Sequence, residues 1–129
     1  MNLRLSILPE RLAVCRLAAS DAVPAWAASG SFSSVTRTPA ELSIVCAEAA
    51  VPGSVGRESG FRAYVVAGPL DFGLTGVIAS LTEPLARAGV PVFVVSTFDT
   101  DYLLVREERL EEASAVLRRA GHSMAPAAV

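Results

Sequence analysis

The chain has 129 residues, of which 52% are hydrophobic and 19% are charged, and its formal net charge is −2. This composition predicts one folded domain, or two small subdomains that share a core, and excludes a disordered chain. The acidic balance argues against nucleic-acid binding, which usually requires a basic surface. All eleven cationic residues are arginines. The chain therefore lacks a Schiff-base lysine, the lysine of a Walker motif and a polybasic membrane patch of lysines.

The N-terminal stretch does not have the pattern of a targeting segment. Arg4, Glu10 and Arg11 interrupt its apolar residues, so it lacks the core of a signal peptide. No window approaches the roughly 20 apolar residues of a membrane span. We therefore expect a cytoplasmic protein that does not contact a membrane, with Cys15 and Cys46 as buried reduced thiols.

The first half of the chain predicts short strands and little helix. Alternating or apolar runs predict strands at residues 3–7, 11–17, 32–37 and 41–47, with Pro39 at the tip of a hairpin between the last two. Ser20 and Asp21 predict the cap of a short helix that Gly30 ends. Residues 51–60 hold three glycines and a proline, so we expect a connector there.

The second half has clearer periodicity. Apolar residues at helical spacing predict a helix over 72–89 and another over 107–120, and apolar runs predict strands over 61–68, 91–97 and 102–106. Pro84 should remove one backbone hydrogen bond from the earlier helix and kink it. Gly121 ends the last helix, and residues 122–129, which include the single histidine, are expected to form a flexible tail with no role for His122.

The two halves resemble each other in element order. When residues 32–48 are laid on 92–108, Val35 aligns with Val95 and Glu41 aligns with Asp101. Each half then has the order strand–helix–strand–strand–helix, which predicts an α+β fold of two tandem ferredoxin-like βαββα units, with antiparallel sheets and helices on one face. The first unit, over 1–60, is degenerate because its first helix is shortened. The second covers 61–121, and the strand at 3–7 is expected to join it.

Two motifs in the second half carry a family resemblance. They are GPLDFGLTG at 68–76 and STFDTD at 96–101, separated by a helix with an internal proline. In this order they resemble the ACT domains, the small-molecule-binding modules found in tandem in aspartate kinases and in the cytosolic arginine sensors of animals. The resemblance is strongest over 61–121 and weaker, but in register, over 11–48.

The resemblance implies that an amino acid or similar metabolite binds between ACT units. It places the ligand against the loop before the first helix and the end of the facing strand, at Gly68, Pro69, Leu70, Gly73, Leu74, Thr75, Gly76, Val77, Ser96, Thr97, Phe98 and Asp101. In the arginine sensors, the positions that match Thr97, Phe98 and Asp101 hold the ligand. The first half has Arg37, Thr38 and Glu41 at the corresponding positions and lacks a glycine-rich loop, so we expect no site there.

Physical chemistry supports the same residues. The loop 68–76 presents backbone N–H groups at a helix N-terminus, which favours a carboxylate, while Asp101 could accept from an ammonium or a basic side chain. Phe98 would form an apolar wall or lid. Structural alternatives remain: Asp71 as a helix cap, 99–101 as an ordinary hairpin turn, and Phe98 as a core residue.

The resulting functional prediction is a non-catalytic regulatory or sensor protein that needs no cofactor and no metal. We expect a homodimer in which the loop 68–76 of one chain faces 97–101 of its partner. The alternatives are a structural module that binds an unknown protein partner without a ligand, or an enzyme such as an acylphosphatase. The enzyme is disfavoured because Asn2 is the only asparagine and GPLDFGLTG contains no arginine.

Overall fold

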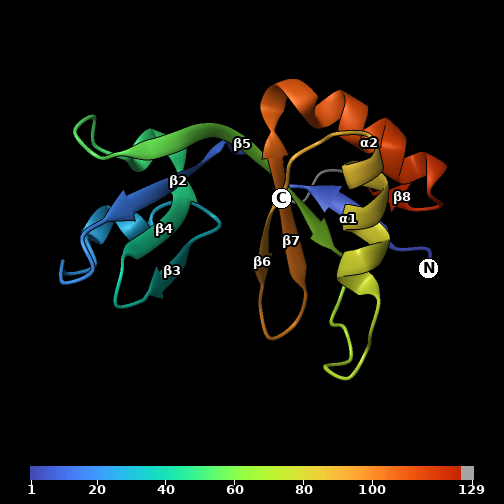
Figure 1. The fold of residues 1–129 in the computed structure, drawn as a ribbon, viewed down its shortest axis with the longest axis horizontal. Coiled ribbons are helices and arrows are strands. Elements are labelled where there is room, and N and C mark those ends of the chain that lie inside the picture. The colour runs from blue at the N-terminus through green and yellow to red at the C-terminus, as the bar shows by residue number, and fades with distance from the viewer. Residues whose placement is uncertain (126–129) are drawn as a thin grey trace. The chain divides into compact units, whose positions relative to one another are not determined.

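A computed structural model of the chain describes residues 1–125. They form two compact units, drawn in Figure 1. The N-terminal unit is Glu10–Phe61, and the C-terminal unit combines Met1–Pro9 with the described residues from Arg62 onward. The α+β fold class predicted from the sequence is confirmed. Residues 1–9 belong to the C-terminal unit, as expected for the strand at 3–7.

The N-terminal unit is an antiparallel sheet with two short 3₁₀ turns. Its strand order is β3-β4-β2-β5, and only the first residues of β5 belong to it. Its elements are β2 (Leu12–Leu17), η1 (Ala25–Ala28), β3 (Ser34–Arg37), β4 (Leu42–Ala47), η2 (Glu48–Ala50) and the start of β5 (Arg57–Val66). A 3₁₀ turn thus stands at each of the two places where the predicted βαββα unit would have a helix. The core contains Cys15 and Cys46, which are free and buried.

The C-terminal unit contains the complete pattern. After the end of β5 it has α1 (Val77–Arg87), β6 (Phe93–Ser96), β7 (Asp101–Arg106), η3 (Glu107–Arg109) and α2 (Leu110–Arg119), and it adds β1 (Arg4–Ile7) and β8 (Ser123–Met124). The sheet order is β6-β7-β5-β1-β8, in which β1 pairs antiparallel with β5 and parallel with β8. Figure 1 shows α1 and α2 beside each other against the strands of this unit.

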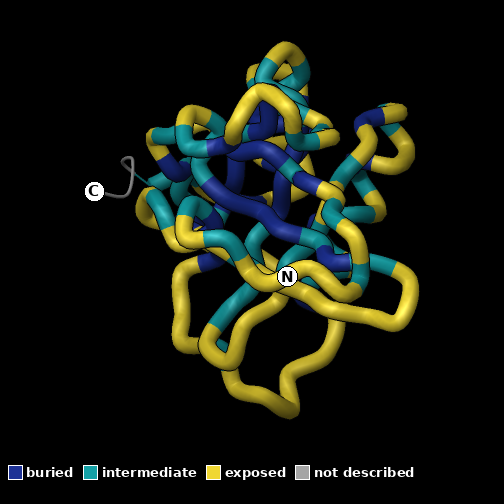
Figure 2. The backbone as a smooth tube through the Cα atoms, turned by 90° about the vertical axis from the view of Figure 1, so that its left-hand side faces the viewer, coloured by how far each residue is buried: buried dark blue, intermediate teal, exposed yellow. Residues whose placement is uncertain are grey.

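The core of the C-terminal unit follows from two periodicities. Alternate residues of β5 and β7 face the helices, and residues at helical spacing on α1 and α2 face the strands. The residues that meet there include Tyr64, Val66, Leu81, Leu85, Leu103, Val105, Ala113 and Leu117. Figure 2 shows buried segments alternating with exposed loops along the chain. Within residues 1–125, no helix has the length and hydropathy of a membrane-spanning segment.

Several element boundaries differ from those expected. Helix α1 begins at Val77 instead of residue 72, because Gly76 at its N-cap has φ of 86° and so interrupts helical backbone. Strand β5 begins at Arg57, inside the segment expected to be a connector. Asp21 caps no helix: its carboxylate accepts a hydrogen bond from the Ala18 N–H at 3.2 Å.

His122 is the largest correction, because it lies in the core instead of an idle tail. Its side chain is 4% exposed, Nδ1 accepts from the Leu3 N–H at 3.0 Å, and Nε2 lies 3.0 Å from the Ser80 carbonyl. Since Nδ1 accepts, Nε2 carries the proton and donates. The expected tail also contributes β8 (Ser123–Met124) to the sheet, and its residues 126–129 lie outside the described residues.

His122 also explains how α1 continues through Pro84. The helical partner of the Ser80 carbonyl would be the N–H of residue 84, which proline lacks. The imidazole Nε2 supplies the missing donor from the far end of the chain. One side chain therefore joins α1, the N-terminal strand and the C-terminal segment.

The alignment of the two halves was wrong by one residue. The hairpin pairs are Arg37↔Leu42 and Ser96↔Asp101, so Leu42, not Glu41, is equivalent to Asp101. A shift of one residue places a side chain on the opposite face of a sheet. The acidic position that the alignment matched is therefore not shared between the units.

Candidate functional site

The candidate site lies in the C-terminal unit, where the loop between β5 and α1 meets the hairpin turn between β6 and β7. Both segments lie at the same end of α1 in Figure 1. The Leu70 N–H donates to the Asp99 carbonyl at 2.7 Å, and the Thr100 hydroxyl donates to the Val66 carbonyl at 2.6 Å. These two short bonds fix the loop and the turn relative to each other.

Gly68 makes this close approach possible. A Cβ at this position would lie 3.1 Å from the Asp99 carbonyl oxygen and 3.3 Å from the Thr100 Cβ. Both distances are tighter than ordinary van der Waals contact, so a side chain here would push the turn away. Gly68 thus shapes the site from outside the pocket.

The N-terminus of α1 forms one wall of the site. The first helical hydrogen bond runs from the Ser80 N–H to the Gly76 carbonyl at 2.9 Å, and Gly76 provides no side-chain cap. The N–H groups of Val77, Ile78 and Ala79 therefore have no partner within the helix. Together with the helix dipole they give this wall a partial positive charge.

The β6–β7 turn forms the opposite wall. The Thr97 N–H donates to the Thr100 carbonyl at 2.8 Å, and the Thr97 hydroxyl oxygen lies 3.2 Å from the Thr100 N–H. These bonds close a four-residue turn with Phe98 and Asp99 at its tip. Asp101 follows as the first residue of β7, paired with Ser96.

A pocket of about 350 Å³ lies between these walls, which is within the size range of small-molecule sites. It is lined by Leu70, Asp71, Phe72, Leu74, Gly76, Val77, Ile78, Ala79, Ser96, Thr97, Phe98, Asp99, Thr100 and Asp101. The structure thus brings together most residues expected from the sequence. Gly68, Pro69, Gly73 and Thr75 belong to the same loop but do not line the pocket.

Six lining residues were missed by the sequence reasoning: Asp71, Phe72, Ile78, Ala79, Asp99 and Thr100. All of them lie within or directly beside the two motifs. Asp71 and Asp99 are aspartates, a residue type that is common in turns. An ordinary turn was also the alternative given for residues 99–101. The structure shows that turn geometry and pocket lining coexist in the same residues.

Three carboxylates and one helix N-terminus line the pocket. Asp71, Asp99 and Asp101 line it, and no arginine does. One oxygen of the Asp71 carboxylate accepts from the Gly73 N–H at 2.8 Å. Among residues 1–125, no protein group donates to the carboxylates of Asp99 and Asp101. The pocket therefore combines free carboxylates with the N-terminal end of a helix, as a zwitterionic ligand requires.

Both sides of the expected site come from one chain. The bonds from Leu70 to Asp99 and from Thr100 to Val66 are within the chain, so a second copy is not needed to bring the loop 68–76 beside 97–101. The expectation that the loop 68–76 of one chain also faces residues 97–101 of its partner in a homodimer stays a prediction.

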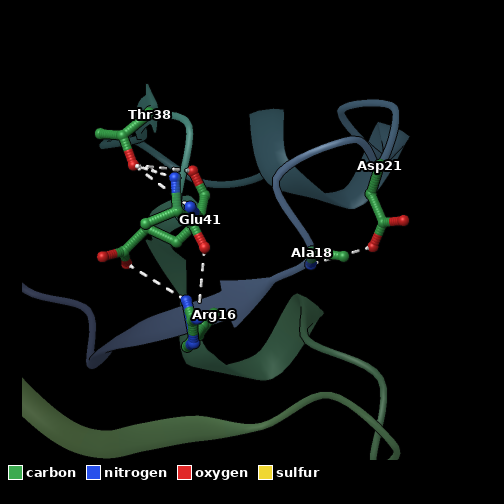
Figure 3. Close-up of polar contacts among 6 residues, drawn as sticks. Arg16, Ala18, Asp21, Thr38 and Glu41 are labelled. Atoms are coloured by element: carbon green, nitrogen blue, oxygen red, sulfur yellow. Dashed lines mark hydrogen bonds and ion pairs between the residues drawn. The ribbon is translucent and has the colours of Figure 1, made fainter.

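The matching hairpin of the N-terminal unit has the same turn but lacks the rest of the site. The Thr38 hydroxyl oxygen accepts from the Ala40 and Glu41 N–H groups, each at 3.1 Å. The Glu41 carboxylate lies 3.9 Å from the Arg16 guanidinium, and Figure 3 shows Thr38, Glu41 and Arg16 together. Arg16 also donates to the Ala40 carbonyl at 3.3 Å. Arginine thus engages this turn, and no α-helix begins beside it.

Comparison with known proteins identifies the family. Residues 57–119 match the family model described as an ACT domain, and residues 10–54 match a second model, described as an N-terminal domain. Residues 57–119 of the chain belong to the ACT domain family. The ACT domain covers β5 to α2, which includes the entire pocket.

The proteins to which the chain is similar include an arginine sensor, a bacterial protein and a regulatory subunit of aspartate kinase. The human cytosolic arginine sensor for mTORC1 subunit 1 is 35% identical over 57 residues, which are 44% of this chain but only 17% of the sensor. A crystal structure from Agobacterium tumefaciens is 43% identical and matches all of this chain and 96% of that one, with a TM-score of 0.94. The regulatory subunit of aspartate kinase from Thermus thermophilus, at 11% identity over 90% of this chain and 96% of its own, shares the fold with a TM-score of 0.57.

Proposed function

We propose that this chain is a non-catalytic regulatory module that binds an amino acid in the pocket between the β5–α1 loop and the β6–β7 turn. The observation that carries the proposal is the opposition of an uncapped helix N-terminus and unpaired carboxylates across about 350 Å³. An amino acid presents a carboxylate and an ammonium two bonds apart, which matches this arrangement. The name of the human sensor makes L-arginine the first ligand to test.

In the proposed complex, the ligand carboxylate accepts from the N–H groups at the start of α1, where the helix dipole stabilises negative charge. Asp101 accepts from a cationic group of the ligand, and Thr97 contributes its backbone or hydroxyl. Leu70 and Leu74 supply apolar contact to the carbon atoms of the ligand. All of these residues line the pocket.

A catalytic role is disfavoured by the chemistry of the site. A nucleophilic mechanism would need a base, and the only histidine is committed through both ring nitrogens to Leu3 and Ser80. The pocket lining includes no arginine or asparagine, so the groups of an acylphosphatase are missing from it. Regulatory relatives support the same conclusion.

We also propose that the module acts in the cytoplasm as a homodimer, with the ligand at an interface between ACT units. The name of the human sensor, which calls that protein cytosolic, supports the location. The exposed aromatic residues Phe72 and Phe98 beside the pocket support a covering surface. If light scattering at high protein concentration gives the mass of a single chain, the homodimer proposal is refuted, and the pocket within one chain is unaffected.

Thermal melting against the twenty amino acids, each at several millimolar, tests the function. A ligand at 100 times its dissociation constant stabilises the native state by about 2.7 kcal/mol. We expect a higher midpoint with one chemically related set, and loss of the shift in Asp101→Asn. Glu111→Gln, on the exposed surface of α2, is the matched control and should keep the shift. No shift with any amino acid would refute the proposal and favour the alternative, a partner-binding module without a ligand.

A further inference from the structure

The first turn of α1, which forms one wall of the pocket, is held through Ser80. The Ser80 N–H donates to the Gly76 carbonyl at 2.9 Å, and the Ser80 hydroxyl donates to the Val77 carbonyl at 2.7 Å. Both acceptors belong to residues that line the pocket. The remaining polar group of Ser80, its carbonyl, accepts from the His122 Nε2 at 3.0 Å. His122 therefore acts on the pocket wall through one residue, although it does not line the pocket.

The segment that carries this histidine is attached to the sheet by few bonds. Strand β8 has two residues and lies at the edge of the sheet, beside β1. The Ser123 N–H donates to the Leu3 carbonyl at 2.9 Å, and the Ala125 N–H donates to the Leu5 carbonyl at 2.6 Å. Short edge elements with few contacts are the parts of a protein that open locally at the lowest free-energy cost. We therefore expect residues 121–125, the C-terminal segment, to open before the rest of the unit.

Opening of the C-terminal segment would affect α1 because of Pro84. An ordinary helix would supply the N–H of residue 84 to the Ser80 carbonyl, but proline has none. When His122 leaves, that carbonyl loses its donor and the helix cannot replace it. The same end of the helix has no side-chain cap, because its N-cap is Gly76. The first turn of α1 thus depends on a bond from outside the helix.

We propose that His122 is a positioning residue for the ligand pocket, which fixes the first turn of α1 through Ser80 only while the C-terminal segment is docked on β1. The proposal rests on the proposed amino-acid function and adds its regulation. A ligand that accepts from the N–H groups of Val77, Ile78 and Ala79 requires this turn to be formed, so it favours the docked segment. Because coupling between two sites is reciprocal, docking raises the ligand affinity by the same factor. The C-terminal segment is thus the element that responds to occupancy of the pocket.

Amide hydrogen exchange of the full chain, followed by NMR, tests the first link without any ligand. In His122→Phe, the Ser80 N–H should exchange roughly 5- to 10-fold faster relative to the amides of β7, because one hydrogen bond that supports the turn is lost. Adding Pro84→Ala restores a helical donor to the Ser80 carbonyl and should reverse most of this gain. Tyr64→Phe, which removes a buried hydroxyl that contacts α2, is the matched control for lost stability and should leave the ratio unchanged.

The second link is tested by adding L-arginine, or any amino acid that raises the melting midpoint, at 100 times its dissociation constant. The Ser123 and Ala125 N–H groups should then exchange roughly 5-fold more slowly, or slower still, relative to the amides of β7. His122→Phe should abolish this slowing and weaken ligand binding by a similar factor.

A second variant serves if His122→Phe does not fold. Gly121 has φ of 101°, and a Cβ there would lie 2.6 Å from the Asn2 Oδ1 atom. Gly121→Ala should therefore release the C-terminal segment while it keeps the imidazole. The Ser80 N–H should again exchange faster relative to β7.

The outcomes separate this inference from the function on which it rests. A ratio of Ser80 exchange to β7 exchange that is the same in wild type and in both variants would overturn the positioning role. A ligand that binds but leaves the exchange of Ser123 and Ala125 unchanged would overturn the coupling, and amino-acid binding would stand. If no amino acid binds, the proposed function and the coupling both fail, whereas the ligand-free exchange still decides whether His122 supports the first turn of α1.

Discussion

The link between His122 and Ser80 makes a quantitative prediction. His122→Phe keeps the ring volume but leaves the Leu3 N–H and the Ser80 carbonyl without the partners they have at 3.0 Å. Each lost partner of a buried group costs about 1 to 3 kcal/mol, and the lower end applies to Ser80 because its bond is only part-buried. We expect His122→Phe to lower the free energy of unfolding by about 2 to 3 kcal/mol.

The role of Pro84 can be isolated with a double-mutant cycle. Pro84→Ala restores the N–H that an α-helix donates to the Ser80 carbonyl, so that carbonyl no longer depends on His122. In the Pro84→Ala background, His122→Phe should therefore cost about 1 kcal/mol less than in the wild type.

Urea unfolding followed by circular dichroism measures both costs. With a slope of about 1 to 3 kcal/mol per molar, His122→Phe alone should lower the midpoint by about 1 to 2 M. If His122→Phe lowers the free energy of unfolding by the same amount, within about 0.5 kcal/mol, in the wild type and in Pro84→Ala, the imidazole does not replace the missing helical donor and the reasoning fails.

Two further predictions concern buried groups. Burial raises the pKa of the Cys46 thiol from 9.0 to about 11, so the unfolded chain loses this proton at a lower pH than the folded chain, and the free energy of unfolding should fall as the pH rises through that interval. Cys46→Ala should make this fall less steep. A slope of the urea midpoint against pH that is the same in Cys46→Ala and in the wild type would contradict the prediction. Tyr64→Phe removes the hydroxyl that lies 2.6 Å from the Ser114 hydroxyl and 3.1 Å from the Leu110 carbonyl, which should cost about 1 to 2 kcal/mol in the same assay. Adding Ser114→Ala to Tyr64→Phe should restore part of the lost free energy of unfolding. If the double variant is instead less stable by the sum of the two single costs, the hydroxyl pair does not contribute to stability.

The sequence was sufficient to predict the C-terminal unit because its helices and strands have distinct periods. Leu81 and Leu85 repeat at the helical spacing, and Tyr64 and Val66 at the strand spacing, and both patterns reflect burial on one face. The placement of the glycine-rich loop and the polar hairpin on two sides of one site came from the resemblance to ACT domains and not from these periods.

The remaining features depend on contacts that a single sequence does not reveal. Leu3 and His122 are separated by nearly the whole chain, and only the parallel pairing of β1 with β8 brings them together. Phe72 was missed because an exposed ring in a loop has no periodicity to mark it. The register error between the halves arose because a match between Glu41 and Asp101 looked chemically sound, whereas turn geometry aligns Thr38 with Thr97.

The most direct test of the account is an amide NMR titration of the full chain with L-arginine and with any amino acid that raises the melting midpoint. Binding as proposed should shift the resonances of Val77, Ile78 and Ala79 and of the turn 97–101, and should leave the N-terminal unit unchanged. Shifts that cluster in the N-terminal unit, or no shifts with any of the twenty amino acids, would contradict the claim that this pocket is an amino-acid site.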